Sequence, residues 1–600
     1  MSEQVKDRNQ IEKEYLWDLA TLYTSDEEWE KHFSTMDEKI QKVTSFVGKL
    51  NTPQNMKAYL DYQTSISKEI ENLFNYASLR RSEDTRESYP QQMYARIYGK
   101  YVTLATLDSF AIPEFLSLAD ETIQEILNSE EVKEYRFNLE LIVKQKPHTL
   151  SEKEEALLAR FGEVIGAPGI VSDNLMDADM KFESVKDSQG NEIPLTGSNF
   201  ILLQTSKDRE LRKNAFKSFY KTYVEHINTL ASLYSANVKA AVAEAETRHY
   251  QSSREMSLER NNIPLSVYDN LIDTVHKHMD TMYRYVRLRK RLLGVDELHY
   301  YDLYTPLVQE DHKTYTYEEA QEVILEAIKP LGEDYNNTVR NAFKDRWIDV
   351  YPNKGKSTGA YSSGTYDSNP FILTNFTGTL DSVSTIAHEM GHSMHSWLAK
   401  HAQPPQYADY TLFVAEVAST VNENLLIEHL MKNCEDPKEK LGYLNQYLEG
   451  FKGTVYRQTM FAEFEKIAHE MAQKGEALDP KNLNEVYHNL IVQYFGDDLI
   501  LDEEVDYEWS RIPHFYRPFY VYVYATGYTS AVALSELIMQ SPENAKKYLE
   551  FLSMGGSQYP LDELRHGGVD LTTPEPIDIA LNKFAKALDE AEKIADELGY

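Results

Sequence analysis

Residues 385–397, TIAHEMGHSMHSW, place four side chains that can bind a metal or move a proton close together: His388, Glu389, His392 and His395. Histidines four residues apart lie on one face of a helix, with Cβ atoms roughly 6 Å apart, so both imidazoles can reach one cation. A glutamate directly after the first histidine projects beside the pair, where it can accept a proton from a water molecule that the metal activates. The spacing predicts that His388 and His392 bind a metal and that Glu389 is a general base.

The third ligand must come from another part of the chain. His395 shares the predicted face, but seven residues of helix rise about 10.5 Å, which is too far for His388 and His395 to converge on one ion. We therefore expect His395 to support the site or to contact the substrate.

Glu416 is the predicted third ligand. It is embedded in FVAEVA, residues 413–418, and a carboxylate among apolar neighbours needs a cationic partner or a metal. Glu423 follows seven residues later on the same face and is expected to hydrogen-bond a ligand histidine. Two histidines and one carboxylate leave a position open for water, which is typical of a catalytic zinc site. We predict one Zn²⁺ per chain, although cobalt or manganese would accept the same ligands.

Donors for the oxyanion of a tetrahedral intermediate are expected near the C-terminus. The stretch RIPHFYRPFYVYVYATGY, residues 511–528, combines His514 with several tyrosines. Tyr522 and Tyr524 are the first candidates as catalytic hydroxyl donors, and Tyr520 comes next as a substrate-binding group. Periods of two and of four turn different tyrosines inward, so the spacing does not choose among them, and packing alone also explains such a cluster.

The apolar segment before the metal motif, residues 370–376, is predicted to be a strand that leads into the motif helix, with Asp381 as its cap. At the edge of a sheet, this strand would pair its free backbone groups with an extended peptide, and Phe371 and Leu373 would contact the substrate. A strand buried in the core explains the same pattern, so both interpretations stay open.

Composition argues against several partners and kinds of site. A net charge of −34 does not suit nucleic acid or anionic membranes, which need clustered Lys and Arg. The single cysteine, Cys434, excludes a disulfide framework and a Cys-rich zinc module, so a metal must use histidine and carboxylate. The sequence shows no apolar signal segment and no uncharged apolar run near 20 residues, so we expect a cytoplasmic protein.

The elements that position these residues are predicted to be mostly α-helical. Apolar residues recur at three and four positions through most of the chain, and 600 residues are expected to form two or more lobes around a deep cleft. Residues 25–50 are predicted to form one long amphipathic helix opened by Ser25, and residues 188–191 to form the turn of a hairpin. We predict an N-terminal helical lobe over residues 1–200, ending in this hairpin, and a catalytic domain over residues 201–600.

These motifs resemble those of a known family. HEMGHSMH, FVAEVAST and the C-terminal His–Tyr stretch are similar to the thimet oligopeptidase and neurolysin family of zinc peptidases. YQSSREMSLERNNIP and PHFYRPFYVYVYATGY are most similar to its bacterial oligoendopeptidase F branch. The resemblance implies two helical lobes that flank a deep substrate channel, with zinc near its floor and a small β element beside the zinc helix. It implies that His388, His392 and Glu416 bind zinc. Glu389 would be the base, and His514 would act on the transition state.

The predicted function is that of a zinc metalloendopeptidase that hydrolyses internal bonds of short oligopeptides, its expected partners. The implied channel would admit short unstructured peptides and exclude folded proteins. One alternative is a dipeptidyl carboxypeptidase of the same fold, which would need a pocket for the terminal carboxylate of the substrate. The other is a non-catalytic peptide-binding zinc protein, which would leave Glu389 without a purpose.

Overall fold

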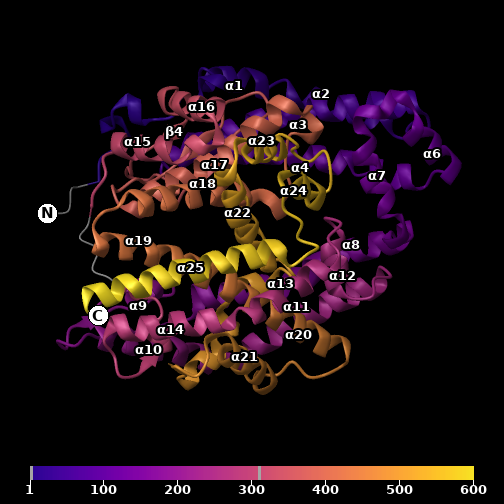
Figure 1. Cartoon of the computed structure of the whole chain (residues 1–600). Helices are drawn as coiled ribbons and strands as arrows, with labels where there is room; N and C mark the ends of the chain where they lie inside the picture. Colours follow the sequence, from indigo (N-terminus) through magenta and orange to yellow (C-terminus); the bar gives the residue numbers. More distant parts are fainter. Residues whose placement is uncertain (1–4, 308–312) are drawn as a thin grey trace. The chain divides into compact units, whose positions relative to one another are not determined.

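The computed structural model describes residues 5–307 and 313–600, and helices dominate it as predicted (Figure 1). The strands among these residues are short and form three small sheets. The chain divides into two compact units, each assembled from three stretches. Unit 1 takes residues 1–149, 312–429 and 534–568, and unit 2 takes residues 150–311, 430–533 and 569–600. The predicted division into two continuous domains at residue 200 differs from these discontinuous units, and it stays a prediction.

Unit 1 contains the N-terminal helices and the helices that carry the metal motif. Its helices are α1 (Asp26–Phe33), α2 (Met36–Lys42), α3 (Pro53–Glu83), α4 (Ser88–Asp108), α5 (Ala111–Leu116), α6 (Asp120–Asn128), α7 (Arg136–Lys144), α15 (Tyr317–Ala327), α16 (Glu333–Lys344), α17 (Leu380–Ala402), α23 (Pro542–Leu552) and α24 (Pro560–Gly567). Helix α18 (Leu412–Asn433) begins in this unit.

The prediction of one helix over residues 25–50 is wrong, because the chain forms α1, α2 and a short 3₁₀ helix there. Ser25 caps α1 as predicted, since its hydroxyl accepts a hydrogen bond from the amide of Glu28 at 3.3 Å. The break comes at Ser34 and Thr35, whose hydroxyls donate to the carbonyls three residues earlier, each at 2.8 Å. Side chains of this kind compete with the helix ladder and so end helices.

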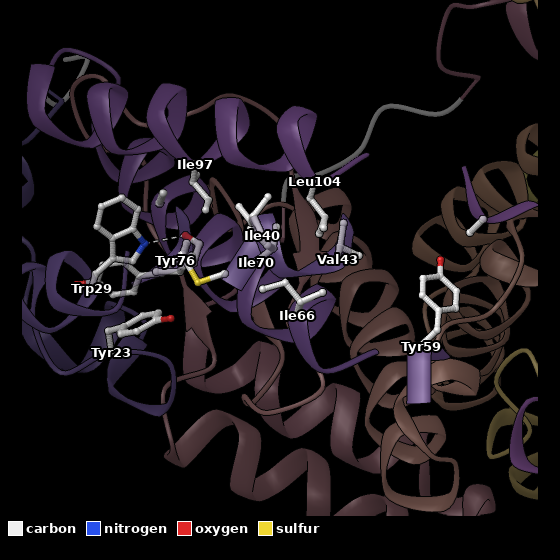
Figure 2. Close-up of a cluster of buried hydrophobic side chains, with 14 of the residues drawn as sticks. Tyr23, Trp29, Ile40, Val43, Tyr59, Ile66, Ile70, Tyr76, Ile97 and Leu104 are labelled. Carbon is white, nitrogen blue, oxygen red and sulfur yellow. Dashed lines mark hydrogen bonds between the residues drawn. The ribbon is translucent and has the colours of Figure 1, made fainter. Parts of the chain in front are cut away.

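The core of unit 1 gathers apolar side chains from α1 to α4 (Figure 2). Trp29 is fully buried, and its ring nitrogen donates a hydrogen bond to the carbonyl of Leu73 at 2.8 Å, which ties α1 to α3. Ile66 and Ile70 extend the same buried face of α3, as expected for residues four apart. No single helix among the described residues has both the length and the apolar composition needed to cross a membrane. One bent pair, residues 88–116 with 120–128, meets both criteria only when its parts are taken together.

A three-stranded sheet precedes the metal helix, and it corrects one prediction. Strand β6 (Phe371–Leu373) lies between β4 (Ile348–Asp349), to which it is parallel, and β5 (Tyr361–Ser363), to which it is antiparallel. Phe371 and Leu373 are fully buried and belong to the core cluster of unit 1. The edge-strand interpretation is therefore wrong, because both sides of β6 are already paired, and its two side chains pack in the core instead of facing a substrate.

Unit 2 is also helical. Its helices are α8 (Glu152–Asp173), α9 (Phe200–Gln204), α10 (Arg209–Glu225), α11 (Ile227–Thr247), α12 (Ser253–Glu259), α13 (Leu265–Lys277), α14 (Met279–Leu293), α19 (Pro437–Gly450), α20 (Arg457–Gln473), α21 (Pro480–Phe495) and α25 (Glu575–Leu598), with the start of α22 (Tyr522–Gln540). The predicted hairpin is present, with β1 (Val185–Lys186) antiparallel to β2 (Glu192–Ile193). Its turn includes Gly190 at a φ of +85°, which glycine adopts without strain. Strands β3 (Leu298–His299) and β7 (Leu499–Ile500) form a parallel pair.

Candidate metal site

Helix α17 presents the histidine motif on one face and packs with the other. The hydroxyl of Thr379 accepts a hydrogen bond from the amide of Ser382 at 3.2 Å, so Thr379 is the N-cap and the predicted cap, Asp381, lies in the first turn. The predicted apolar stripe is fully buried at Val383, Ala387, Met390 and Met394, and Leu398 is half-buried. This buried stripe fixes the rotation of the helix and so the direction of its histidines.

Helices α17 and α18 cross at very short range, and a glycine allows it. A Cβ atom on Gly391 would lie 2.5 Å from the carbonyl oxygen of Ala418 and 2.6 Å from the Cα of Ser419. Beside the crossing, the amide group of Asn422 donates to the carbonyl of Ala387 at 3.1 Å. Gly391 is not among the residues predicted to matter for the site, although an isolated glycine within a helical pattern is a known sign of close packing.

The crossing brings together the three predicted ligands. The Nε2 atoms of His388 and His392 each lie 3.4 Å from Oε2 of Glu416. One donor atom from each residue lies within 4.8 Å of the others, so the three could hold a metal ion. No second group of this kind occurs among the residues that the structure describes. Two imidazoles and a carboxylate are the donors that zinc prefers, so the residues present fit this metal.

The carboxylates around His388 create a site that favours positive charge. Nδ1 of His388 lies 3.4 Å from Oε1 of Glu423, the residue expected to support a ligand histidine. Burial alone would lower the pKa of His388, but Glu416 and Glu423 outweigh it and raise the pKa to about 10. Hydrogen bonds from His388 and His392 hold the pKa of Glu416 well below its ordinary value. Surroundings that hold a proton on His388 also attract a metal cation in its place.

Glu389 lies on the same helix but is not one of the three clustered residues. It is 7% exposed, and this burial raises the pKa of its carboxyl group, against the opposing effect of His388 and His392. A carboxylate whose pKa lies above its ordinary value accepts and releases a proton more readily near neutral pH. The position thus suits the predicted base.

His395 lies in a place that differs from our expectation. It is 1% exposed and stacks on Tyr410, with ring centroids 3.6 Å apart and planes 1° apart. Burial lowers the pKa of His395 to about 3, so the ring is neutral. A buried ring that stacks on Tyr410 does not suit contact with a substrate, and the other expectation, that His395 supports the site, stays a prediction.

In unit 2, a turn of the chain brings His514, Tyr520 and Tyr524 together, and we name these residues the His–Tyr cluster. The Nε2 of His514 and the hydroxyl of Tyr524 are 3.5 Å apart. The ring of Tyr520 lies parallel to that of His514 at 6.4 Å and edge-on to that of Tyr524 at 5.3 Å.

Tyr522 does not join the His–Tyr cluster. It is 3% exposed and packs against Tyr268 at 5.0 Å, and its burial raises the pKa of the phenol. Helix α22 begins at Tyr522, so the helical period decides the inward side here. The expectation that Tyr522 donates to substrate does not suit this buried position.

The helical fold, and a His-His-Glu group formed by the HEMGH helix α17 together with Glu416 of α18, define the class of helical peptidases with an H-E-x-x-H motif. The model described as Peptidase family M3 matches residues 202–583, and that described as Oligopeptidase F matches residues 114–182. The chain belongs to peptidase family M3. The family predicted from the motifs is therefore confirmed.

The relatives cover almost the whole chain. Oligopeptidase PepF of Bacillus subtilis (strain 168) is 46% identical over 594 residues, 98% of this chain and 89% of the relative. Group B oligopeptidase PepB of Streptococcus agalactiae is 41% identical and covers 98% of both chains. A crystal structure of a putative peptidase from Chlamydophila abortus superposes with a TM-score of 0.94 at 35% identity, covering 98% of this chain and 100% of that one. Oligoendopeptidase-F from Enterococcus faecium gives 0.74 at 35% identity, with 95% and 99% covered.

Proposed function

We propose that the protein is a zinc-dependent metalloendopeptidase that hydrolyses internal peptide bonds of short oligopeptides. The observation that carries the proposal is that donor atoms of His388, His392 and Glu416 lie within 4.8 Å of one another. Glu389 lies on the helix of the two histidines. This donor set leaves room for a fourth, exchangeable position, as catalytic zinc sites require. Membership of peptidase family M3 supports peptides as substrates, and relatives named oligopeptidases support short ones.

Each residue of the site has a distinct task in this proposal. Zinc, when bound by His388, His392 and Glu416, would lower the pKa of water toward 7 and polarise the scissile carbonyl. Glu423 accepts a hydrogen bond from Nδ1 of His388, which leaves Nε2 of that ring free for the metal.

Glu389 moves the proton. A carboxyl oxygen of Glu389 takes it from the attacking water and delivers it to the nitrogen of the leaving amine. Water adds to the carbonyl carbon, the C–N bond breaks, and an acid and an amine are released. We retain the prediction that His514 and a tyrosine donate hydrogen bonds to the oxyanion, with Tyr520 and Tyr524 as the candidates.

Mass spectrometry of products tests the proposal. A ladder of short peptides and one long unfolded protein would be incubated with the enzyme, with and without a zinc chelator. Chelator-sensitive internal cuts confined to the short peptides are the expected result. Successive release of C-terminal dipeptides would replace the proposal with a dipeptidyl carboxypeptidase. No cleavage with any divalent metal would leave a peptide-binding protein.

A further inference from the structure

The turn that forms the His–Tyr cluster contains a backbone conformation that its residue rarely adopts. Phe519 has a φ of +57°, in the left-handed region. An aromatic residue is disfavoured there, and such a conformation persists only where the surroundings hold it. The turn lies between His514 and Tyr520, whose rings are parallel with their centroids 6.4 Å apart.

A buried carboxyl group holds this turn. Oε1 of Glu465, on α20, accepts a hydrogen bond from the amide of Phe519 at 2.6 Å. Glu465 is fully buried, and this burial raises the pKa of the carboxyl group well above its ordinary value, which favours its neutral form. On the other side of the turn, the hydroxyl of Ser257 donates to the carbonyl of Pro518 at 3.0 Å. The Phe519 ring is buried and packs on His469 at 4.6 Å.

Packing alone does not explain a glutamate at this place. The second carboxyl oxygen, Oε2, is buried and has no hydrogen-bond partner among the described residues. A buried polar atom without a partner destabilises a protein, so an apolar side chain of similar size would pack better. What the apolar side chain would lack is the acceptor for the amide of Phe519. A glutamate at position 465 is therefore explained by the acceptor that it provides for the turn.

We propose that Glu465 is a positioning residue of the peptidase, which fixes the amide of Phe519 and thereby holds the His–Tyr cluster in its active arrangement. The proposal rests on the proposed function, because the cluster is the predicted source of donors to the substrate. Arg517, in the same turn, also contacts the cluster, since its guanidinium lies over the ring of Tyr520 at 4.1 Å from the ring centroid. Glu465 acts through the turn and does not itself touch the substrate.

Three variants test this role. Glu465→Met fills the space but removes the acceptor, and we expect kcat to fall by about 100-fold with KM and bound zinc little changed, because misplaced groups raise the barrier rather than weaken ground-state binding. Glu465→Gln keeps an acceptor oxygen and carries no charge, so its kcat should stay within about threefold of that of the parent. Glu463→Met is the matched control on the same helix, since that carboxylate accepts from the hydroxyl of Tyr494 at 2.9 Å and contacts His276 at 2.8 Å, away from the turn. It should lower Tm and leave kcat unchanged.

The outcomes separate the two proposals. A parent enzyme that cleaves no peptide would overturn the proposed function, independently of Glu465. An active parent with Glu465→Met as fast as Glu465→Gln would overturn the positioning role, and so would equal losses in Glu465→Met and Glu463→Met. If Glu465→Met does not fold, Ser257→Ala loosens the turn from its other side. We expect it to lower kcat roughly tenfold, and an unchanged kcat would again refute the proposal.

Discussion

At the scale of single residues, holding a metal and moving a proton are separate tasks on one helix. His388 and His392 face Glu416, whereas Glu389 is turned aside and buried. A change at Glu389 should therefore affect chemistry without affecting the metal. A change at Glu423, which contacts Nδ1 of His388, should instead weaken metal binding directly.

Glu389→Gln removes the proton acceptor and keeps the shape of the side chain. We expect kcat to fall by about 10³-fold or more, because general-base catalysis is lost. Elemental analysis should still find one zinc per chain. Full turnover in this variant would refute the assignment of the base.

Glu423→Ala removes the carboxylate beside Nδ1 of His388. Partners of this kind orient the ligand ring, so we expect zinc affinity to weaken by about 10- to 100-fold. A competition titration with a chelator measures the change. Glu435→Ala, an exposed position just beyond α18, is the control and should bind zinc as the parent does.

Glu563, on α24, gives a prediction for pH. It is 1% exposed, and burial raises the pKa of its carboxyl group to about 8. The folded state thus holds this proton more tightly than the unfolded state, so the contribution is complete below about pH 4.5 and is lost as pH rises toward 8. Glu563→Gln cannot ionise, and its free energy of unfolding relative to the parent should rise between pH 5 and pH 8 by up to a few kcal/mol. Urea unfolding at both pH values measures this, and a constant difference would contradict it.

At the scale of elements, features set by local sequence patterns could be predicted, whereas features that depend on distant strand partners could not. The spacing within one helix predicts His388 and His392, and the apolar neighbours of Glu416 in another predict the third member of the metal group. The place of β6 depends on partners at residues 348–349 and 361–363, which no local pattern reveals.

The residues at which helices begin and end also could not be predicted from local patterns. The burial of Tyr522 depends on where α22 begins, and the same apolar and phenolic residues fit a strand or a helix. The break after α1 depends on the hydroxyls of Ser34 and Thr35, which turn back onto their own chain.

Gly391→Ala tests the helix crossing. The added methyl group meets the backbone of α18, which cannot yield as a flexible side chain would. We expect a loss of about 1–3 kcal/mol in stability, as for other overpacked sites, together with weaker zinc binding because Glu416 is displaced. Gly442→Ala is the matched control, since this glycine of α19 has nothing within 4 Å of a built Cβ. It should be neutral or slightly stabilising, and equal losses in both variants would contradict the crossing argument.

At the scale of the whole molecule, the formal charge of −34 is the dominant feature. A field of this sign attracts cationic substrates and repels anionic ones, most strongly at low ionic strength. Between two peptides of equal length, the one rich in Lys and Arg should have a kcat/KM roughly tenfold higher than the one rich in Asp and Glu at about 10 mM salt. The gap should close as salt is raised toward about 1 M, where screening acts within about 3 Å. A neutral peptide is the control, and a gap independent of salt would point to specific contacts instead.

The assembly of each unit from three stretches of chain also governs how the protein is made. On the ribosome, residues 1–149 emerge early, but the core they share with Phe371 and Leu373 stays incomplete for tens of seconds at ordinary rates of synthesis. The last stretch of unit 1, residues 534–568, emerges later still, just before α25 of unit 2. Unit 1 thus cannot be complete before residues 534–568 are made, nor unit 2 before residues 569–600, so we expect the nascent chain to expose apolar surface over a long part of its synthesis. The metal group is also incomplete until Glu416 of α18 has been made, so a shorter nascent chain lacks one of the three residues of that group.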